Sequence, residues 1–464
     1  MAPTERPTHL PCPARAVAPL LTLALLLTAC GSESSVDAHD DAGAVDDTPV
    51  QTELVIEPCE QPHAPVLFVH GGFGSGDQFT LQAQRLASNG YCESHIRTFD
   101  YDSQTNTGMA TAATITRLDA AVDSLLEDTG AERLHMLGHS NGCSIARDYL
   151  EDAEHSAKVE KYVNVAGAEW AFPDDTEVLG LTSEGDQIIG RVEYEGADNP
   201  AMPVLDHIAI LTAVEPFEAI HEFFTGEAPE TTRVVESDVR HVSGFVMNFA
   251  ENVARVDTTI DVWPVDAETG ERIGDEPTVS LVTEEGGAFG PFAAEADTYY
   301  EFFIPDGSEM DMPLHVYVEP FKRSMHLLYL KTMPAPLTAA GFLLSGIAPP
   351  TTDATGGIIQ HTDRAIDKAI DSLTVDGVEA AIDGVADVES TTVAIFFADG
   401  NENGVTDATP LSQLSIAPFL KGIDVFIPSD EDTPLVFDLN GQRIATPRWA
   451  TDPEGTITVL FASE

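Results

Sequence analysis

The stretch L-H-M-L-G-H-S-N-G, residues 134–142, decides the fold. Its first four residues form a short apolar run typical of a buried strand, and Gly138 to Gly142 then fits the pattern G-x-S-x-G ahead of a helical segment. A sharp turn from strand to helix raises a serine hydroxyl above the edge of a sheet, and small flanking residues let the backbone approach closely. The stretch therefore predicts an α/β fold with Ser140 at such a turn.

Strands and helices alternate on both sides of this stretch. Residues 65–70 (P-V-L-F-V-H) form another dense apolar run, which leads into a glycine-rich turn. Further strands are predicted over 95–99, 161–165 and 178–181, and helices over 78–89, 111–126, 143–150 and 208–224. Such alternation predicts a mostly parallel sheet covered by helices on both faces.

The composition excludes several classes of protein. The 464 residues include 22 Lys and Arg against 78 Asp and Glu, a net charge of −56. Nucleic acid binding needs clustered cations, so no nucleic acid partner is expected. Attachment to a bilayer through a basic patch is excluded for the same reason. A hydrophobic fraction of 43% is too high for a disordered acidic chain, so we expect a folded protein with a solvated acidic surface.

The amino terminus reads as an export signal. Two arginines precede an apolar run, residues 16–29, which is too short to span a bilayer, so residues 1–29 are predicted to be a signal peptide. The end of this run, L-T-A-C, resembles the bacterial lipoprotein box, and this resemblance implies that Cys30 carries lipid such as palmitate. An ordinary signal with an incidental cysteine is the alternative. Residues 30–56 are predicted to be a flexible acidic tether that holds the protein at the cell envelope.

Three further cysteines follow the signal. Cys59 precedes the first predicted strand and Cys92 shortly precedes the second. If these strands are parallel neighbours, their starts lie within disulfide reach, and an exported protein permits oxidation, so a Cys59–Cys92 disulfide is predicted. Cys143 falls one turn into a helix and is predicted to be a small buried hydrophobic residue.

A serine hydroxyl is a weak nucleophile unless an adjacent base takes its proton. In the predicted fold an acid and then a histidine follow the serine along the chain. His207 stands just before the final predicted helix and is the expected base. Asp186, in an acidic turn after the fifth strand, is the expected acid that orients this histidine. Glu184 is an alternative acid, and a solvated turn aspartate without a catalytic role would also fit.

An anion that forms on a substrate oxygen needs preorganised backbone N–H groups. The residue after the serine, Asn141, supplies one of them. The turn H-G-G-F-G-S, residues 70–75, is expected to supply the other, and Gly72 is the favoured donor. His70 precedes this turn and is expected to be a buried structural residue.

At these residues the chain resembles α/β-hydrolase triacylglycerol lipases. The segments V-L-F-V-H-G-G-F-G-S-G-D-Q-F (66–79) and D-H-I-A-I-L-T-A-V-E-P-F-E-A-I-H-E-F-F-T-G (206–226) carry this resemblance. Downstream, D-V-W-P-V-D (261–266) and I-A-P-F (416–419) resemble archaeal lipases that have a carboxyl-terminal lipid-binding β domain. The resemblance implies cleavage of acylglycerol esters with no required cofactor. Some lipases of this layout place the acid after the strand that follows the serine, which adds Glu169 as a further candidate acid.

The second half of the chain has a different pattern of apolar and turn-forming residues. Short β-like runs alternate with turns rich in Gly, Pro and Asp, which favours β-sandwiches. The predicted domains are the catalytic domain over 57–230, a β-sandwich accessory domain over 231–350 and a second β-rich accessory domain over 351–464. Binding of a lipid or polymer surface and a purely structural extension are alternative roles for these two domains.

One turn in this half has the spacing of a calcium loop. D-G-N-E-N-G-V-T-D, residues 399–407, places side-chain oxygens at Asp399, Asn401, Asn403 and Asp407, with glycine sixth. The final bidentate glutamate of such loops is absent. A structural Ca²⁺ site and an acidic β-hairpin turn are therefore alternative interpretations.

The sequence as a whole predicts a monomeric, exported serine carboxylester hydrolase that acts on lipid esters. A short-chain esterase or polyester depolymerase is the nearest alternative. A catalytically silent lipoprotein that binds surfaces is an alternative from a different class.

Overall fold

The computed structural model describes residues 63–249, 251–306, 312–333, 351–361, 364–415 and 419–462. All of them belong to one compact unit, Pro49–Glu464. The predicted signal peptide, Cys30, the acidic tether and Cys59 lie outside the described residues. Cys92 is disulfide-bonded, and its pairing with Cys59 stays a prediction. Cys143 is buried and its thiol is free.

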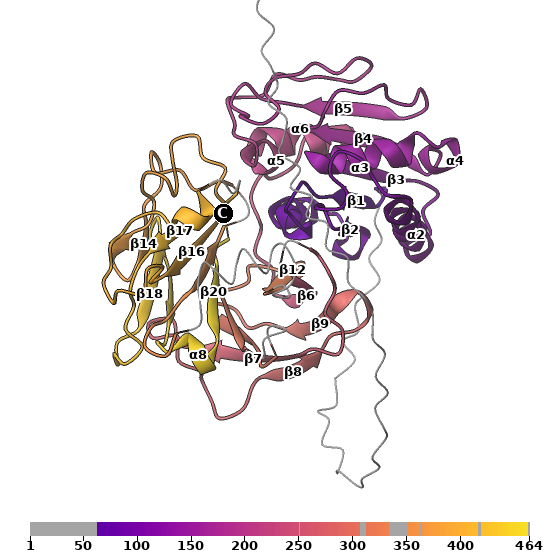
Figure 1. The fold of residues 1–464 in the computed structure, drawn as a ribbon. Helices are drawn as coiled ribbons and strands as arrows, with labels where there is room; N and C mark the ends of the chain where they lie inside the picture. The colour runs from indigo at the N-terminus through magenta and orange to yellow at the C-terminus, as the bar shows by residue number, and fades with distance from the viewer. Residues whose placement is uncertain are drawn as a thin grey trace, which may run out of the picture. The chain divides into compact units, whose positions relative to one another are not determined.

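The amino-terminal half contains a parallel sheet of five strands in the order β2-β1-β3-β4-β5, with helices packed against it (Figure 1). The strands are β1 (Val66–Val69), β2 (Ile96–Phe99), β3 (Leu134–His139), β4 (Val159–Val165) and β5 (Glu177–Leu181). The helices are α1 (Thr80–Ser88), α2 (Ala112–Thr129), α3 (Asn141–Leu150), α4 (Ala153–Ser156), α5 (Ala209–Thr212) and α6 (Val214–Thr225). Short 3₁₀ turns over Gly76–Phe79 and Glu93–His95 precede α1 and β2.

Helices cover both faces of this sheet. Phe79 and residues of α1 and α6, such as Leu86 and Phe217, share one apolar core with Phe68 of β1. Residues of α2 and α3, such as Val122, form a second core against the opposite face. Each strand is therefore buried on both sides, which explains the dense apolar runs and confirms the predicted α/β fold.

The helix predicted over 208–224 is interrupted. Ala213 adopts an extended ψ of 167°, which separates α5 from α6. Pro216 has no N–H to offer to the carbonyl of Thr212, four residues earlier, so a continuous helix would leave that oxygen without a partner. Arg85 instead donates to the Thr212 carbonyl at 2.5 Å. This break leaves the segment that carries His207 separate from the body of α6.

The described residues of the carboxyl-terminal half form three sheets. Their strands are β6 (His241–Asn248), β7 (Thr259–Val265), β8 (Val279–Val282), β9 (Ala288–Ala293), β10 (Tyr299–Ile304), β11 (Leu314–Val318), β12 (Met325–Thr332), β13 (Gly357–Gln360), β14 (Leu373–Val375), β15 (Val378–Glu379), β16 (Ala394–Ala398), β17 (Leu420–Asp424), β18 (Leu435–Leu439), β19 (Gln442–Thr446) and β20 (Thr456–Leu460). The largest sheet has the order β17-β16-β13-β20-β11-β10-β7-β8. Sheets β12-β6-β9 and β15-β14-β18-β19 complete the set. Turns over Glu285–Gly287 and Ser412–Leu414 and the short α8 (Thr451–Glu454) connect strands.

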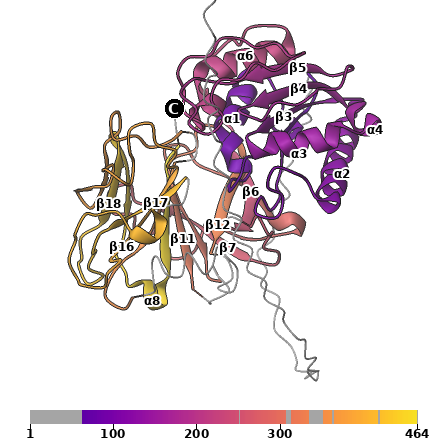
Figure 2. The ribbon, with the colours of Figure 1, turned by 45° about the horizontal axis from the view of Figure 1, so that its top comes forward.

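Two sandwiches share the eight-stranded sheet. Its β7, β10 and β11 strands form one core with β12-β6-β9, and its β13, β16 and β20 strands form another with the four-stranded sheet. Side chains alternate across β11, so that Val316 lies in the first core and Tyr317 in the second. Figure 2 shows β18 and β16 in separate layers of this region.

The predicted boundary near residue 350 falls between strands of one continuous sheet. Parallel pairing of β11 with β20, from Leu314 opposite Thr456 to Val318 opposite Leu460, joins the two predicted accessory domains. The strand-rich character of this region is confirmed, and its division into two domains stays a prediction.

Strand β12 lies against the amino-terminal half. The Tyr329 hydroxyl donates to Asp100 at 2.6 Å, and Lys331 pairs with Asp77 at 2.5 Å. The Thr80 hydroxyl donates to the carbonyl of Leu327 at 3.1 Å. Part of the amino-terminal half therefore depends on residues from beyond position 320. Among the described residues, no helix is both long and apolar enough to cross a bilayer.

Candidate active site

Ser140 occupies a strained turn between β3 and α3. Its φ of +52° and ψ of −118° lie in a backbone region that residues other than glycine rarely adopt. A Cβ at Gly142 would lie 2.2 Å from the Val69 carbonyl oxygen, and one at Gly138 would lie 3.0 Å from the backbone nitrogen of Cys143. The pattern G-x-S-x-G thus has a steric origin here, because larger residues at either glycine would prevent the tight turn.

His207 lies between Asp186 and Ser140. The Nε2 atom of His207 is 2.9 Å from the Oγ atom of Ser140, and its Nδ1 atom is 2.9 Å from the Oδ2 atom of Asp186. His207 and Asp186 are buried, with 1% and 4% of their surfaces exposed, whereas Ser140 is partly accessible. The structure brings together the three residues predicted as nucleophile, base and acid.

The Asp186 carboxylate is held from two sides. Its Oδ1 atom accepts hydrogen bonds from the amides of Ile188 and Ile189 at 2.8 and 3.0 Å, while Oδ2 faces His207. Burial alone would raise the pKa of this carboxyl, but the hydrogen bond and charge of His207, with the two amides, lower it below the ordinary value. Asp186 is therefore charged and orients the imidazole at neutral pH.

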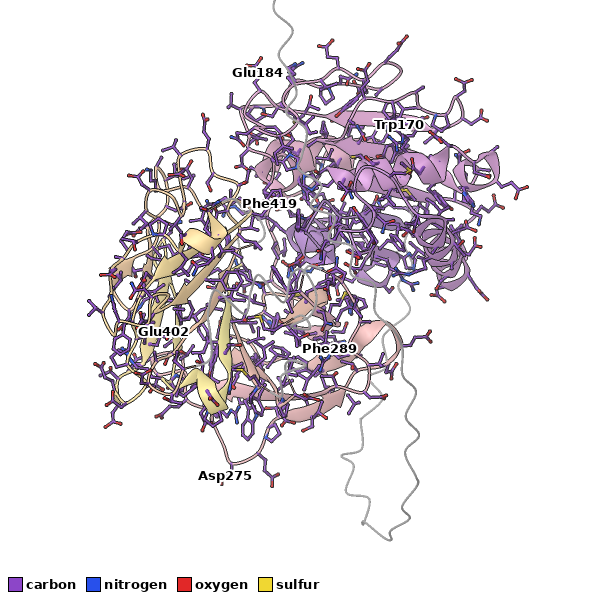
Figure 3. All side chains as sticks on the ribbon, in the orientation of Figure 1. Trp170, Glu184, Asp275, Phe289, Glu402 and Phe419 are labelled. Carbon is purple, nitrogen blue, oxygen red and sulfur yellow. The ribbon has the colours of Figure 1, made fainter. Side chains whose placement is uncertain are left out.

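The two alternative acids lie elsewhere. Glu184 and Glu169 are both exposed, and Figure 3 shows Glu184 at the surface of the molecule. Only Asp186, of these three carboxylates, is hydrogen-bonded to His207. The order and spacing of residues had left this choice open, and the geometry favours Asp186.

The predicted oxyanion donors lie on adjoining backbone segments. A Cβ at Gly72 would lie 3.9 Å from the Cβ of Asn141, and one at Gly71 would lie 3.2 Å from the Cβ of Ser140. The amide of Gly71 donates to Gln78 and that of Phe73 donates to Ser103. Within the described part of the chain, the amides of Gly72 and Asn141 have no acceptor. They are thus available to a ligand.

His70 stabilises the glycine-rich turn through hydrogen bonds of its buried ring. The amide of Tyr101 donates to its Nε2 atom at 3.1 Å, so its Nδ1 atom carries the proton and donates to the Gly71 carbonyl at 2.8 Å. Burial lowers the pKa of this histidine, which keeps it neutral. His70 is fully buried and stacks on the ring of Tyr101, as expected for a structural residue.

Two supporting residues, Asn252 and Phe419, were not predicted from the sequence because they come from the carboxyl-terminal half. The side-chain amide of Asn252 donates to the carbonyls of Gly74 and Tyr101 at 2.8 and 3.1 Å. The ring of Phe419, labelled in Figure 3, lies 6.3 Å from that of His207 between centroids, with 27° between their planes. No local sequence signal could have placed either residue at this site, since both contacts join positions more than a hundred residues apart.

His139 is a third residue that sequence reasoning missed. It is the variable residue before the serine in the G-x-S-x-G pattern, and its Nε2 atom is 2.9 Å from the carbonyl oxygen of His207. Burial, and then the charge of His207, lowers the pKa of His139 to about 3. The ring is thus neutral, and its N–H can hold the backbone of residue 207 in place.

One cavity adjoins the glycine-rich turn, and a second cavity shares two residues with it. The smaller, of about 40 Å³, has an apolar lining of Phe73, Ile208, Phe249, Val393, Phe419 and Leu420. The larger, of about 510 Å³, lies among α1, β12 and strands of the eight-stranded sheet, and shares Asp77 and Gln360 with the smaller one. The smaller cavity, which Gly72 also lines, thus combines a few polar groups with apolar space, as is common for small-molecule sites.

Two family models match parts of this chain, and solved structures show a more distant likeness. Residues 64–185 match the family model described as alpha/beta hydrolase fold, and residues 238–334 match the one described as lipase C-terminal domain. Over 34% of its length the chain is similar to 89% of a lipase from Bacillus licheniformis in mature form, with 15% identity and a TM-score of 0.26. Over 36% it is similar to 86% of a carboxylesterase from Bacillus subtilis, with 17% identity and a TM-score of 0.26.

Proposed function

This chain is an α/β-hydrolase of the lipase family, and from that premise we propose that it is an exported serine carboxylester hydrolase that cleaves acylglycerol esters. Ser140 is the nucleophile, His207 the general base and Asp186 the orienting acid. The single observation that carries this proposal is the pair of 2.9 Å contacts that His207 makes with Ser140 and Asp186.

The first half of the reaction forms an acyl-enzyme. His207 Nε2 takes the proton of the Ser140 hydroxyl as the oxygen attacks the ester carbonyl carbon. The charge that develops on the carbonyl oxygen is stabilised by the amides of Gly72 and Asn141. His207 then gives the proton to the departing alcohol, and the carbon–oxygen bond of the ester breaks.

The second half of the reaction frees the enzyme. Water enters, His207 takes one of its protons, and the resulting hydroxide attacks the acyl carbon. The bond to Ser140 breaks, the serine oxygen regains a proton from His207, and a carboxylic acid leaves. Asp186 keeps its charge throughout and stabilises the imidazolium that forms twice in the cycle.

Support for an acyl substrate comes from the apolar lining next to the glycine-rich turn. Phe73 and Phe419 from opposite halves of the chain face one cavity beside the proposed oxyanion donors. This cavity, of about 40 Å³, has space for only part of an acyl chain, and burial there would be favourable at roughly 0.8 kcal/mol per methylene. The carboxyl-terminal half then serves the reaction in two ways, as part of the acyl site and as the proposed binder of a lipid surface.

A hydrolysis panel tests this proposal. Purified wild type and Ser140→Ala are compared on soluble esters of increasing chain length, emulsified triacylglycerols and polyester films. Wild-type activity on the glycerides that Ser140→Ala abolishes is the expected outcome. Activity on short esters or films alone would favour the esterase or depolymerase alternative, and no activity would favour a silent surface-binding lipoprotein.

The proposed location is the cell envelope, with acylated Cys30 as the anchor and a lipid ester as the principal partner. Support comes from the sequence L-T-A-C, residues 27–30, after an apolar run. Growth with a clickable palmitate analogue tests this proposal. Wild type should carry the label in the membrane fraction, and Cys30→Ser should carry none; equal labelling of both would refute the anchor.

A further inference from the structure

The carboxylate of Asp424 is incompletely satisfied. Asp424 ends strand β17 and only 4% of its surface is exposed. Its Oδ2 atom accepts a hydrogen bond from the side-chain amide of Asn401 at 2.9 Å. Its Oδ1 atom is buried and, within the described part of the chain, has no hydrogen-bond partner. Burying a carboxylate oxygen without a partner costs free energy, and a cation bound to this atom would offset that cost.

Two further carboxylates surround Asp424. Asp399 follows Ala398, which pairs with Asp424 between β16 and β17, and the amide nitrogen of Asn401 donates to both Asp407 and Asp424. No lysine or arginine of the described residues forms an ion pair with any of these three aspartates. Three carboxylates at close quarters without a cation repel one another, and a divalent ion would remove that repulsion.

Two asparagine side-chain amides donate hydrogen bonds to these carboxylates. The Asn401 amide nitrogen donates to Asp407 Oδ2 at 2.9 Å as well as to Asp424, and the Asn403 amide nitrogen donates to Asp407 at 3.1 Å. Among the described residues, no three His, Cys, Asp or Glu side chains form a ready metal site. A half turn of the Asn401 amide replaces its N–H group with an oxygen, a metal ligand of the kind that calcium prefers. A half turn of the Asn403 amide does the same, but it also ends the hydrogen bond that the Asn403 Oδ1 atom accepts from the amide of Val405 at 2.7 Å.

The backbone holds these groups in place. Asp399 accepts hydrogen bonds from the amides of Asn403 and Gly404 at 3.2 and 2.7 Å, which curls the loop around its own first residue. The amide of Asp424 donates to the Thr409 carbonyl at 2.8 Å, which fixes β17 against the end of the loop. The loop and the strand therefore keep their relative position whether or not the amides turn.

We propose that a Ca²⁺ ion binds between this loop and β17, with Asp399, Asn401, Asn403, Asp407 and Asp424 as ligands. The twelfth position of the loop, where calcium loops place a glutamate, is Pro410 in this chain. Asp424 supplies the missing carboxylate from a neighbouring strand instead. A site of several flexible oxygens suits Ca²⁺ better than Mg²⁺, which demands closer octahedral geometry.

The site lies on the strand that leads to the candidate active site. Phe419 precedes β17, contacts the ring of His207, and its carbonyl accepts hydrogen bonds from the amides of Val393 and Ala394. Asp424 stands at the opposite end of the same strand. Ca²⁺ at Asp424 would therefore stabilise the strand that presents Phe419, and this consequence rests on the proposed function, whereas the binding of Ca²⁺ does not.

Isothermal titration of CaCl₂ into the full-length, EDTA-treated protein tests the proposal directly. Wild type should bind one Ca²⁺ with a dissociation constant of about 10⁻⁴ M. Saturating Ca²⁺ should raise the thermal midpoint by about 5 °C, since only the folded state holds the site. Because the chain carries a net charge of −56, the titration is run at about 150 mM NaCl to suppress diffuse binding.

Matched variants separate this site from the acidic surface. Asp407→Asn and Asp424→Asn should each weaken binding at least tenfold and remove most of the thermal shift. Glu402→Gln removes a charge from the same loop, but Glu402 is exposed and is not a proposed ligand, so this control should bind like wild type (Figure 3). Absence of Ca²⁺ binding in wild type, or equal binding by Asp407→Asn and Glu402→Gln, would overturn the proposal.

Discussion

The ring of His139 lies 4.9 Å from the ring of His207 between centroids, and its Nε2 atom bonds to the His207 carbonyl at 2.9 Å. One histidine thus fixes the backbone of another, which in turn contacts Ser140. Because burial and the neighbouring charge lower the pKa of His139 to about 3, this donor keeps the same form across the working range of the enzyme. His139 is therefore a positioning residue for the proposed base.

His139→Phe removes the donor and retains a ring. Displacement of His207 should lower kcat by about 10- to 100-fold with little change in KM, since small misplacements of a catalytic group are costly. The matched control is His135→Phe, on the same strand, where the buried ring stacks on Phe224 away from the site. Steady-state kinetics on a soluble ester checks this prediction. An equal loss of kcat in both variants would show that only stability had changed.

Asp186→Asn should reduce kcat by about 10³- to 10⁴-fold while the overall structure is retained. An amide cannot stabilise the imidazolium, and it favours the wrong tautomer of His207. Glu184→Gln is the matched control, because Glu184 is an exposed neighbour on the same turn. A comparable loss in Glu184→Gln would reassign the acid.

Asp186 should also make stability depend on pH. Its folded-state pKa lies below the ordinary value of about 3.9, so its stabilising contribution is complete above that pH and is lost as the pH falls through the folded-state pKa. The difference in unfolding free energy between wild type and Asp186→Asn should thus be constant near neutrality and shrink below about pH 4. Denaturant titrations at several pH values measure it, and a difference that grew on acidification would have the wrong sign.

Asn252 should prove to be an anchor of the glycine-rich turn. Its φ of +52° suits asparagine, aspartate or glycine, and its amide donates to the carbonyls of Gly74 and Tyr101. Asn252→Gly loses these hydrogen bonds, at a cost of about 1–3 kcal/mol. Asn252→Asp also turns a carboxylate toward two carbonyl oxygens. The expected order of kcat and thermal midpoint is wild type, then Asn252→Gly, then Asn252→Asp; wild-type kcat in Asn252→Asp would refute the anchor.

Phe419 should affect long acyl chains more than short ones. Its ring lines the small cavity and contacts His207, so Phe419→Ala should lower kcat/KM for an octanoate ester about tenfold and leave the acetate ester nearly unchanged. Phe419→Leu, which retains apolar volume, should recover most of the loss. Point variants are preferable to truncation after residue 230, which would also remove the contacts of Asn252 with Gly74, of Tyr329 with Asp100 and of Lys331 with Asp77. Equal effects on both esters would contradict an acyl-site role.

The parts of this molecule that the sequence predicts are those set by local patterns. Buried strands such as β1 appear as apolar runs, and the tight turn at Ser140 requires the small residues that make its pattern visible. His207 and Asp186 follow from chain order, although Glu184 and Glu169 could be separated from Asp186 only by burial and hydrogen bonding. These distinctions depend on which side chain points inward, and no local pattern records that.

The remaining features depend on contacts between distant segments. The pairing of β11 with β20 joins residues about 140 positions apart. The two predicted accessory domains therefore share a sheet that the sequence of neither segment predicts. Asn252 and Phe419 reach the candidate site in the same way. Asp424 completes the proposed calcium site from a strand whose sequence, L-K-G-I-D, has no metal-binding pattern. Features that form by pairing between distant segments could therefore not be predicted from the sequence alone.

The most direct test of the account is the mass of the protein after reaction with a fluorophosphonate, followed by peptide mapping. An activated serine should displace fluoride and retain the phosphonyl group, so wild type should gain one adduct, located on Ser140. Ser140→Ala should gain none, and His207→Ala should react far more slowly because the hydroxyl keeps its proton. An unmodified wild type, or an adduct on any other serine, would contradict the central claim.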